Sequence, residues 1–198
     1  MKNKTLVIAE AGVNHNGNIK IAKKLIDAAS KAGADYVKFQ TFKTEELVTS
    51  KASLAGYQKK NLKKKTSQFQ LLKNLELSEF EHKILISHCK KKKIKFLTTA
   101  FDEYSLNFIK KFKLDLIKIP SGELTNYHYL KIVAHQNKKI ILSTGMSTIS
   151  EVKNALKVLK KYGAKQNQIT VLHCSTEYPV PFKNINMNAM TYMKKILN

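Results

Sequence analysis

Two lysines stand inside short apolar runs of the sequence, where a charged side chain is unusual. Lys38 lies in "DYVKFQT" and Lys118 lies in "LIKIPSGE". A buried ammonium group is costly unless an anion or solvent neutralises it. Hydroxyl and backbone N–H donors accompany the lysines, because Ser121 follows Lys118 and another apolar run ends in Ser143 and Gly145. This combination predicts a site that binds phosphate or carboxylate groups.

Two other interpretations of these lysines stay open. A lysine at the end of a strand can extend its ammonium group to solvent. A lysine inside a β/α barrel can instead form a Schiff base with a carbonyl substrate, as aldolases do. Because both Lys38 and Lys118 lie near turns that contain serine or glycine, we favour anion binding over simple exposure to solvent.

Carboxylates and histidines also follow the apolar runs. Glu10 and Glu123 are placed to act as a general acid or base, or to hold sugar hydroxyl groups. His15 and His173 have no second ligand at a spacing typical of metal sites, so we expect them to be structural histidines with hydrogen-bond partners. The two cysteines also lack metal-type spacing, which favours a reduced, cytoplasmic setting.

Six apolar runs alternate with helical patterns along the chain. Strands are expected at residues 5–9, 36–39, 94–98, 114–119, 139–143 and 168–173. Helices are expected at residues 19–32, 80–91 and 104–112, and over a segment that ends at Tyr162. Their expected N-caps are Ser78, Asp102 and either Ser147 or Ser150. Strands that alternate with helices predict a parallel sheet covered on both faces.

Polar residues follow the end of nearly every expected strand, which bears on the kind of α/β fold. An open doubly wound sheet would concentrate them at one switch point, and "GVNHNG" lacks the glycine spacing of a dinucleotide loop. The distribution favours a TIM-type (β/α)8 barrel, whose active site lies at the carboxyl ends of the strands. A closed barrel typically needs about 250 residues. We therefore expect residues 1–198 to be a fragment with about six of the eight βα units.

The charge balance is strongly basic, with 36 basic residues against 14 acidic residues and a net charge of +22. Every basic residue is lysine, whereas nucleic-acid recognition favours arginine, so no nucleic-acid partner is expected. No apolar run approaches the length of a transmembrane helix, so no membrane partner is expected. The positive charge would instead attract anionic substrates.

Four motifs closely resemble those of the bacterial sialic acid synthases, in the same order and with the same spacing. The motifs are "IAEAGVNHNGNIKIAKKLIDAASKAGADYVKFQTF" at 8–42, "IKIPSGELTN" at 117–126, "ILSTGMST" at 141–148 and "LHCSTEYPVP" at 172–181. That family includes N-acetylneuraminate, legionaminate and pseudaminate synthases. The resemblance implies a (β/α)8 barrel. It also implies condensation of phosphoenolpyruvate with an open-chain N-acetylated amino sugar, giving a nine-carbon 2-keto acid and phosphate.

The resemblance assigns roles to matching residues of this chain. It implies that phosphoenolpyruvate is bound by Lys38, Lys118, Ser121 and Ser143. It implies that Glu123 and Glu10 are catalytic, and that Gln40 and Tyr178 contact the sugar. At Thr176 some relatives carry an asparagine that contacts phosphoenolpyruvate, so this chain departs from the pattern there.

The resemblance also implies parts that residues 1–198 do not include. A divalent metal, Mn²⁺ or Mg²⁺, would be bound by two histidines beyond Asn198, and an antifreeze-like domain would follow in a homodimer. We expect residues 1–198 to be a partial synthase barrel domain, inactive and prone to aggregation by itself. The alternatives are a non-catalytic remnant of the fold and a Schiff-base pyruvate aldolase. The acceptor, N-acetylmannosamine or a diacetamido relative, is not specified by the sequence.

Overall fold

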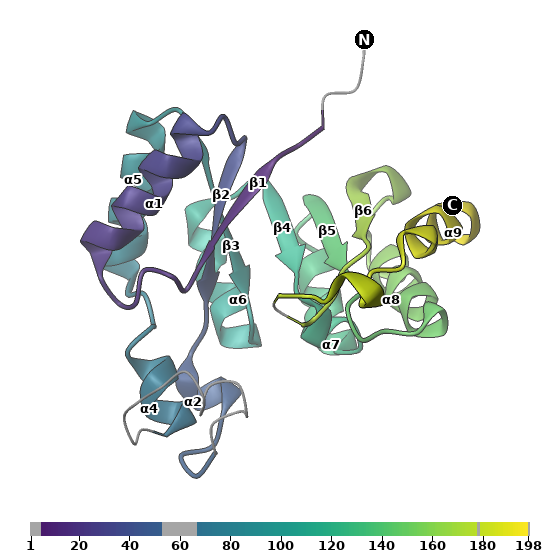
Figure 1. The fold of residues 1–198 in the computed structure, drawn as a ribbon. Coiled ribbons are helices and arrows are strands. Elements are labelled where there is room, and N and C mark those ends of the chain that lie inside the picture. Colours follow the sequence, from purple (N-terminus) through teal and green to yellow (C-terminus); the bar gives the residue numbers. More distant parts are fainter. Residues whose placement is uncertain (1–4, 53–66, 178, 198) are drawn as a thin grey trace. The chain divides into compact units, whose positions relative to one another are not determined.

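A computed structural model describes residues 5–52, 67–177 and 179–197 of the chain. The chain divides into two compact units, Met1–Phe112 and Lys113–Asn198. Each unit contains a three-stranded sheet in which all neighbouring strands are parallel (Figure 1). The prediction of an α/β fold with parallel sheets is therefore confirmed.

The first unit is built on the strand order β1-β2-β3. Its strands are β1 (Ile8–Gly12), β2 (Tyr36–Thr41) and β3 (Lys95–Ala100). Its longer helices are α1 (Ile19–Lys31) and α5 (Glu79–Lys91), which pack side by side on the sheet, and α6 (Glu103–Ile109), which follows β3 (Figure 1). The short helices α2 (Thr44–Leu47) and α4 (Gln68–Lys73) lie in the connection from β2 to α5.

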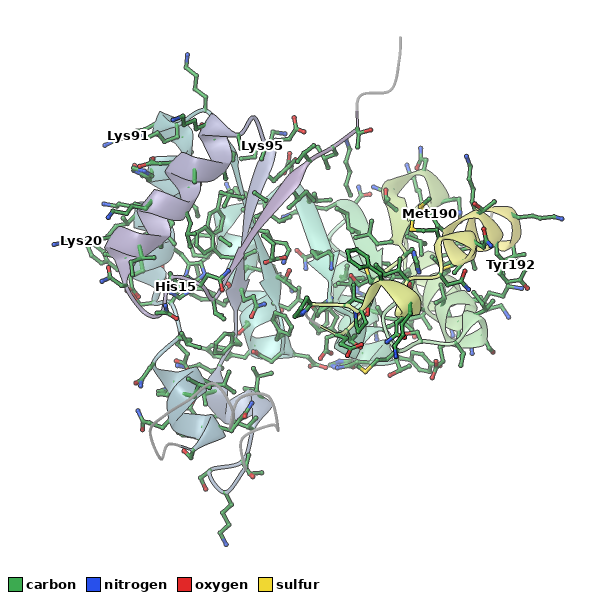
Figure 2. All side chains as sticks on the ribbon, in the orientation of Figure 1. His15, Lys20, Lys91, Lys95, Met190 and Tyr192 are labelled. Atoms are coloured by element: carbon green, nitrogen blue, oxygen red, sulfur yellow. The ribbon has the colours of Figure 1, made fainter. Side chains whose placement is uncertain are left out.

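The second unit repeats this pattern with the strand order β4-β5-β6. Its strands are β4 (Leu116–Ile119), β5 (Lys139–Ser143) and β6 (Ile169–Leu172). Its helices are α7 (Tyr127–Ala134), α8 (Ile149–Lys161) and α9 (Met187–Ile196). Helices α7 and α8 pack against each other, whereas Met190 and Tyr192 of α9 are about half exposed (Figure 2).

Two local expectations need correction. Strand β1 begins at Ile8 and not at Thr5; the backbone N–H of Val7, just before it, donates to the Asp35 side chain, and the Val7 carbonyl accepts from the backbone N–H groups of Asp35 and Tyr36. Helix α8 is capped by Thr148, which forms a capping box with Glu151, so the predicted caps Ser147 and Ser150 are wrong. Helix α7 lies between the fourth and fifth strands, where the alternation predicts a helix for which no bounds were given.

A buried histidine connects the helix and sheet layers of the first unit. His82 of α5 donates its Nδ1 proton to the Ser78 carbonyl at 2.8 Å, since a carbonyl oxygen can only accept. Its Nε2 therefore accepts from the Thr41 hydroxyl of β2 at 2.8 Å. Thr41 in turn accepts from Thr98 of β3 at 2.7 Å. One chain of hydrogen bonds thus joins α5, β2 and β3.

We expect the first unit to lose stability as the pH falls below about 6.5. Burial lowers the pKa of His82 and of His15 from the ordinary value of 6.5. Between the lowered pKa of the folded state and 6.5, the unfolded chain binds protons that the folded chain does not. The free energy of unfolding therefore decreases as the pH is lowered through that window, and it keeps its full value above the window. Urea denaturation from about pH 8 to about pH 5 measures this. The variant His82→Gln should show a smaller decrease, and a pH-independent stability of the wild type would contradict the prediction.

Candidate active site

The first cluster of predicted site residues lies on neighbouring strands of the first unit. Glu10 of β1 is directly opposite Lys38 of β2 in the parallel register. Their side chains form an ion pair with a distance of 2.5 Å between Lys38 Nζ and Glu10 Oε2. The Lys38 side chain is 9% exposed and the Glu10 side chain 56% exposed. The buried ammonium group is therefore neutralised by a carboxylate that also faces solvent.

An irregularity in β1 brings Gln40 into the same cluster. The register of β1 shifts between Glu10 and Gly12, and Gly12 has a φ of +52°. A Cβ atom on Gly12 would lie 3.4 Å from Glu10 Oε1 and 3.7 Å from Gln40 Nε2. Both side chains therefore approach the same glycine backbone. The positive φ favours glycine here, because other residue types rarely adopt it without strain.

Thr99 is a further polar residue at this strand end that the sequence analysis did not assign to the site. It lies opposite Gln40 in the register of β2 with β3. Successive side chains of a strand point to opposite faces, so Thr99 lies on the face opposite to Thr98. Its buried hydroxyl group has no hydrogen-bond partner among the residues that the structure describes. Its position at the end of β3 is the signal that could have identified it.

His15 lies in the turn between β1 and α1 and has a structural role (Figure 2). It is fully buried, and its Nδ1 accepts from the Gly17 backbone N–H at 3.0 Å. The opposite ring nitrogen, Nε2, has no hydrogen-bond partner among the described residues. Unlike the buried His15, the side chains of Lys20 in α1 and Lys91 in α5 are exposed on the helix surface (Figure 2).

The second cluster lies at the carboxyl ends of β4 and β5 in the second unit. The Lys118 ammonium group donates to the Ser143 hydroxyl group, and Ser143 is buried. The Gly145 backbone N–H donates to the Ser121 hydroxyl group at 2.9 Å. The Cys174 thiol also donates to Ser143, at 3.5 Å. An ammonium group, two hydroxyl groups and a backbone N–H thus gather where β4 and β5 end, which is a donor set suited to an anion.

Glu123 belongs to the turn that follows this donor set. It ends the 3-10 helix Ser121–Glu123, which begins directly after Pro120. Its side chain is half-buried and accepts from the Asn126 side-chain amide at 2.7 Å. Tyr178, which we expected to contact the sugar, lies outside the described residues. The structure therefore groups Glu10, Lys38 and Gln40 in one unit, and Lys118, Ser121, Ser143 and Glu123 in the other.

Close packing at Gly145 leads to a prediction about this cluster. A Cβ atom on Gly145 would lie 2.7 Å from Thr176 Cγ2 and 2.9 Å from Ser121 Oγ. We expect Gly145→Ala to lower the free energy of unfolding by about 1–3 kcal/mol, the usual cost of overpacking, because one of these side chains must move. Chemical denaturation measures the change.

The matched control for this prediction is Gly122→Ala in the neighbouring turn. A Cβ atom on Gly122 would meet nothing within 4 Å. We expect this variant to retain the stability of the wild type. An equal loss in both variants would mean that the contacts with Ser121 and Thr176 do not cause the effect.

The described residues also bear on metals and membranes. They include no group of three or more His, Cys, Asp or Glu side chains arranged to hold a metal ion. Among the same residues, no helix has the length and apolar character needed to span a membrane.

Parallel βα units with polar donors at the carboxyl ends of their strands define an α/β fold of the kind that binds ligands at those strand ends. A family model described as "NeuB family" matches residues 25–198. The chain therefore belongs to the NeuB family.

Curated relatives agree with this membership. The chain is 53% identical to N,N'-diacetyllegionaminic acid synthase of Campylobacter jejuni over 96% of this chain and 57% of that protein. It is 32% identical to N-acetylneuraminate-9-phosphate synthase of Drosophila melanogaster over 95% of this chain and 50% of that protein. The chain spans about half the length of the curated relatives it matches.

Solved structures show the same fold. A crystal structure of N-acetylneuraminic acid synthetase from Leptospira borgpetersenii, in complex with citrate, matches with a TM-score of 0.82 and 30% identity, over 98% of this chain and 65% of that one. A truncated 3-deoxy-D-arabino-heptulosonate 7-phosphate synthase from Thermotoga maritima matches with a TM-score of 0.67 at 16% identity, over 98% of this chain and 61% of that one. The second likeness concerns the fold alone.

Proposed function

We propose that this chain is part of a sialic-acid-type synthase. The proposed enzyme condenses phosphoenolpyruvate with an N-acetylated amino sugar, either N-acetylmannosamine or a diacetamido relative, and releases phosphate. The observation that carries the proposal is the donor set of Lys118, Ser143, Ser121 and the Gly145 N–H at the ends of β4 and β5. Further support comes from relatives that are sugar-acid synthases. The six βα units would form part of a (β/α)8 barrel.

The proposed role of the second cluster is to bind the anionic groups of phosphoenolpyruvate. Lys118 supplies a positive charge, and Ser121 and Ser143 supply hydroxyl groups. Charge-assisted hydrogen bonds of this kind are stronger than neutral ones, and they stabilise charge that develops during reaction. In the first unit, Lys38 is proposed to bind phosphoenolpyruvate too, exchanging its contact with Glu10 for one with the substrate.

The reaction has two steps in which bonds form and break. C3 of phosphoenolpyruvate attacks the aldehyde carbon of the sugar, and the aldehyde oxygen takes up a proton. Attack by C3 uses the electron pair of the phosphoenolpyruvate double bond and leaves C2 electron-poor, so water adds to C2 and loses a proton. The tetrahedral intermediate then breaks the bond between C2 and the bridging oxygen, phosphate leaves, and loss of the hydroxyl proton gives the 2-keto acid. Glu123 and Glu10 are the proposed groups for moving protons, and Gln40 and Tyr178 are proposed to contact the sugar.

Several parts of the proposal lie outside the described side chains. Mn²⁺ or Mg²⁺ would polarise the sugar aldehyde when bound, but the described residues do not provide a three-ligand cluster for it. A homodimer is proposed because the resemblance implies one. A cytoplasmic location is proposed because both cysteines, Cys89 and Cys174, are unpaired.

Because the chain spans only about half the length of its curated relatives, its function is tested in a chimera. Residues 1–198 replace the matching segment of the Campylobacter jejuni synthase, which is 53% identical. Phosphate release is followed with phosphoenolpyruvate, Mn²⁺ and each candidate amino sugar in turn. We expect turnover with one sugar class and none after Ser143→Ala in the same chimera. A folded chimera without turnover would overturn the proposal, and so would a borohydride-stable pyruvate adduct on Lys118 or Lys38, which would indicate an aldolase.

A further inference from the structure

Asn126 connects Glu123 to the start of helix α7 through both ends of its side-chain amide. Its Oδ1 accepts from the Tyr129 backbone N–H at 3.1 Å, which caps the helix. Its Nδ2 donates to Glu123 Oε2 at 2.7 Å. Because an amide has a fixed geometry, one side chain sets the position of the carboxylate relative to the helix.

The anchor on the helix side of Asn126 is rigid. Tyr129, Leu130 and Val133 of α7 are fully buried, so the first turn of the helix is held by the core of the second unit. On the other side, the Glu123 backbone is fixed as well, since its N–H donates to the Pro120 carbonyl at 3.0 Å and its carbonyl accepts from the Asn126 N–H at 3.1 Å. The side-chain contact from Asn126 therefore removes much of the rotational freedom left to Glu123.

The contact also favours one protonation state of Glu123. A side-chain N–H that donates to a carboxylate stabilises its ionised form. The N-terminus of a helix acts in the same direction, because the helix dipole places partial positive charge there. An ionised carboxylate is suited to accept a proton, not to donate one.

We propose that Asn126 is a positioning residue that orients Glu123 and keeps it ionised as the proton acceptor of the site. The inference rests on the proposed function for the role of Glu123, but the contact itself can be tested separately. Asn126 would act only through Glu123 and would not touch the substrate.

Two variants separate this role from the helix cap. Asn126→Ser and Asn126→Asp both keep a side-chain oxygen that can cap α7, since Ser, Asp and Asn are similarly good N-caps. Both remove the amide N–H that Glu123 accepts from, and Asn126→Asp adds a second negative charge beside it. We therefore expect nearly wild-type unfolding curves for both. Asn126→Ala, which loses the cap as well, should be measurably less stable.

The first readout is the titration of Glu123 in the folded chimera, followed by ¹³C NMR of its carboxyl carbon. The variant Glu123→Gln identifies the signal by its loss. We expect the titration midpoint to move upward in Asn126→Ser and further upward in Asn126→Asp, because two carboxylates in contact disfavour ionisation. Identical midpoints in wild type and both variants would overturn the proposal.

The second readout is the pH dependence of turnover in the active chimera. We expect Asn126→Ser to lower kcat by about tenfold and to move the acidic limb of the pH profile upward, while the KM for phosphoenolpyruvate stays the same. An unchanged kcat and pH profile in an active chimera would also overturn the proposal. If the wild-type chimera were inactive, the proposed function would fall, and the NMR titration would still decide whether Asn126 holds Glu123.

Discussion

Replacement of Lys118 by alanine is expected to weaken the binding of phosphoenolpyruvate to the chimera that carries residues 1–198 by about 10- to 100-fold. The Lys118 ammonium group contacts Ser143 at the end of β5 and provides a positive charge among the donors of the second unit. A hydrogen bond to a charged group contributes about 1.5–3 kcal/mol, and about 1.4 kcal/mol corresponds to a tenfold change in affinity. Isothermal titration calorimetry measures the dissociation constant.

The matched control for Lys118 is Lys139→Ala. Lys139 is the exposed first residue of β5, so this variant removes the same charge from the other end of a neighbouring strand. We expect its affinity for phosphoenolpyruvate to stay close to that of the wild type. Equal weakening in both variants would show that binding follows the net charge of +22 and not a local site. Unchanged binding in Lys118→Ala would remove the main support for the proposed function.

Replacement of His82 by alanine is expected to lower the free energy of unfolding of the first unit by about 3–5 kcal/mol. The His82 ring is fully buried. It stacks on the Phe112 ring and meets the Phe108 ring edge-on, with 5.3 Å between the ring centroids in both pairs. The substitution leaves a cavity between these rings, and large-to-small core substitutions of aromatic side chains cost this much. It also leaves the Thr41 hydroxyl group without its acceptor. Equilibrium denaturation in urea measures the loss.

Two control variants separate the hydrogen bonds of His82 from its packing. Thr98→Val keeps the shape of the side chain and removes only the hydrogen bond between the Thr98 and Thr41 hydroxyl groups. We therefore expect the free energy of unfolding to fall by about 1 kcal/mol. His128→Ala removes an exposed histidine and should change stability by less than about 0.5 kcal/mol. A loss of about 1 kcal/mol or less in His82→Ala would mean that the ring is not a centre of the core.

The fold was largely predictable because each strand has an unmistakable apolar run and each longer helix has an amphipathic pattern. The bounds of helix α7 were not predicted, for a physical reason. The helix spans only Tyr127–Ala134, so its buried residues cover too few turns to establish a helical period. The cap of α8 was misassigned because Ser147, Thr148 and Ser150 are all chemically suitable. Only Thr148 stands three residues before a glutamate and can form the capping box.

The candidate site was predictable in part. The rule that polar residues at parallel strand ends share one edge correctly indicated the contact of Lys118 with Ser143. The pairing of Lys38 with Glu10 was not predicted. That pairing depends on the register of β1 with β2, which places residues far apart in the sequence opposite each other. Parallel strands joined by a βα connection have no tight turn to set their register, so it depends on how their apolar faces pack, and no short motif specifies it.

The strand order β1-β2-β3 and β4-β5-β6 follows the order of the chain, and this has a consequence for how the protein folds. Each described strand pairs with the strand next to it in the sequence, so the loop closed at each step is a single βα connection. The connections that close β1 with β2 and β4 with β5 are shorter than the one that closes β2 with β3, and a shorter loop costs less entropy to close. During synthesis on the ribosome, β2 can therefore pair with β1, and β5 with β4, as soon as each strand emerges. The growing chain can bury its apolar strands one at a time, which shortens the period in which they are open to aggregation.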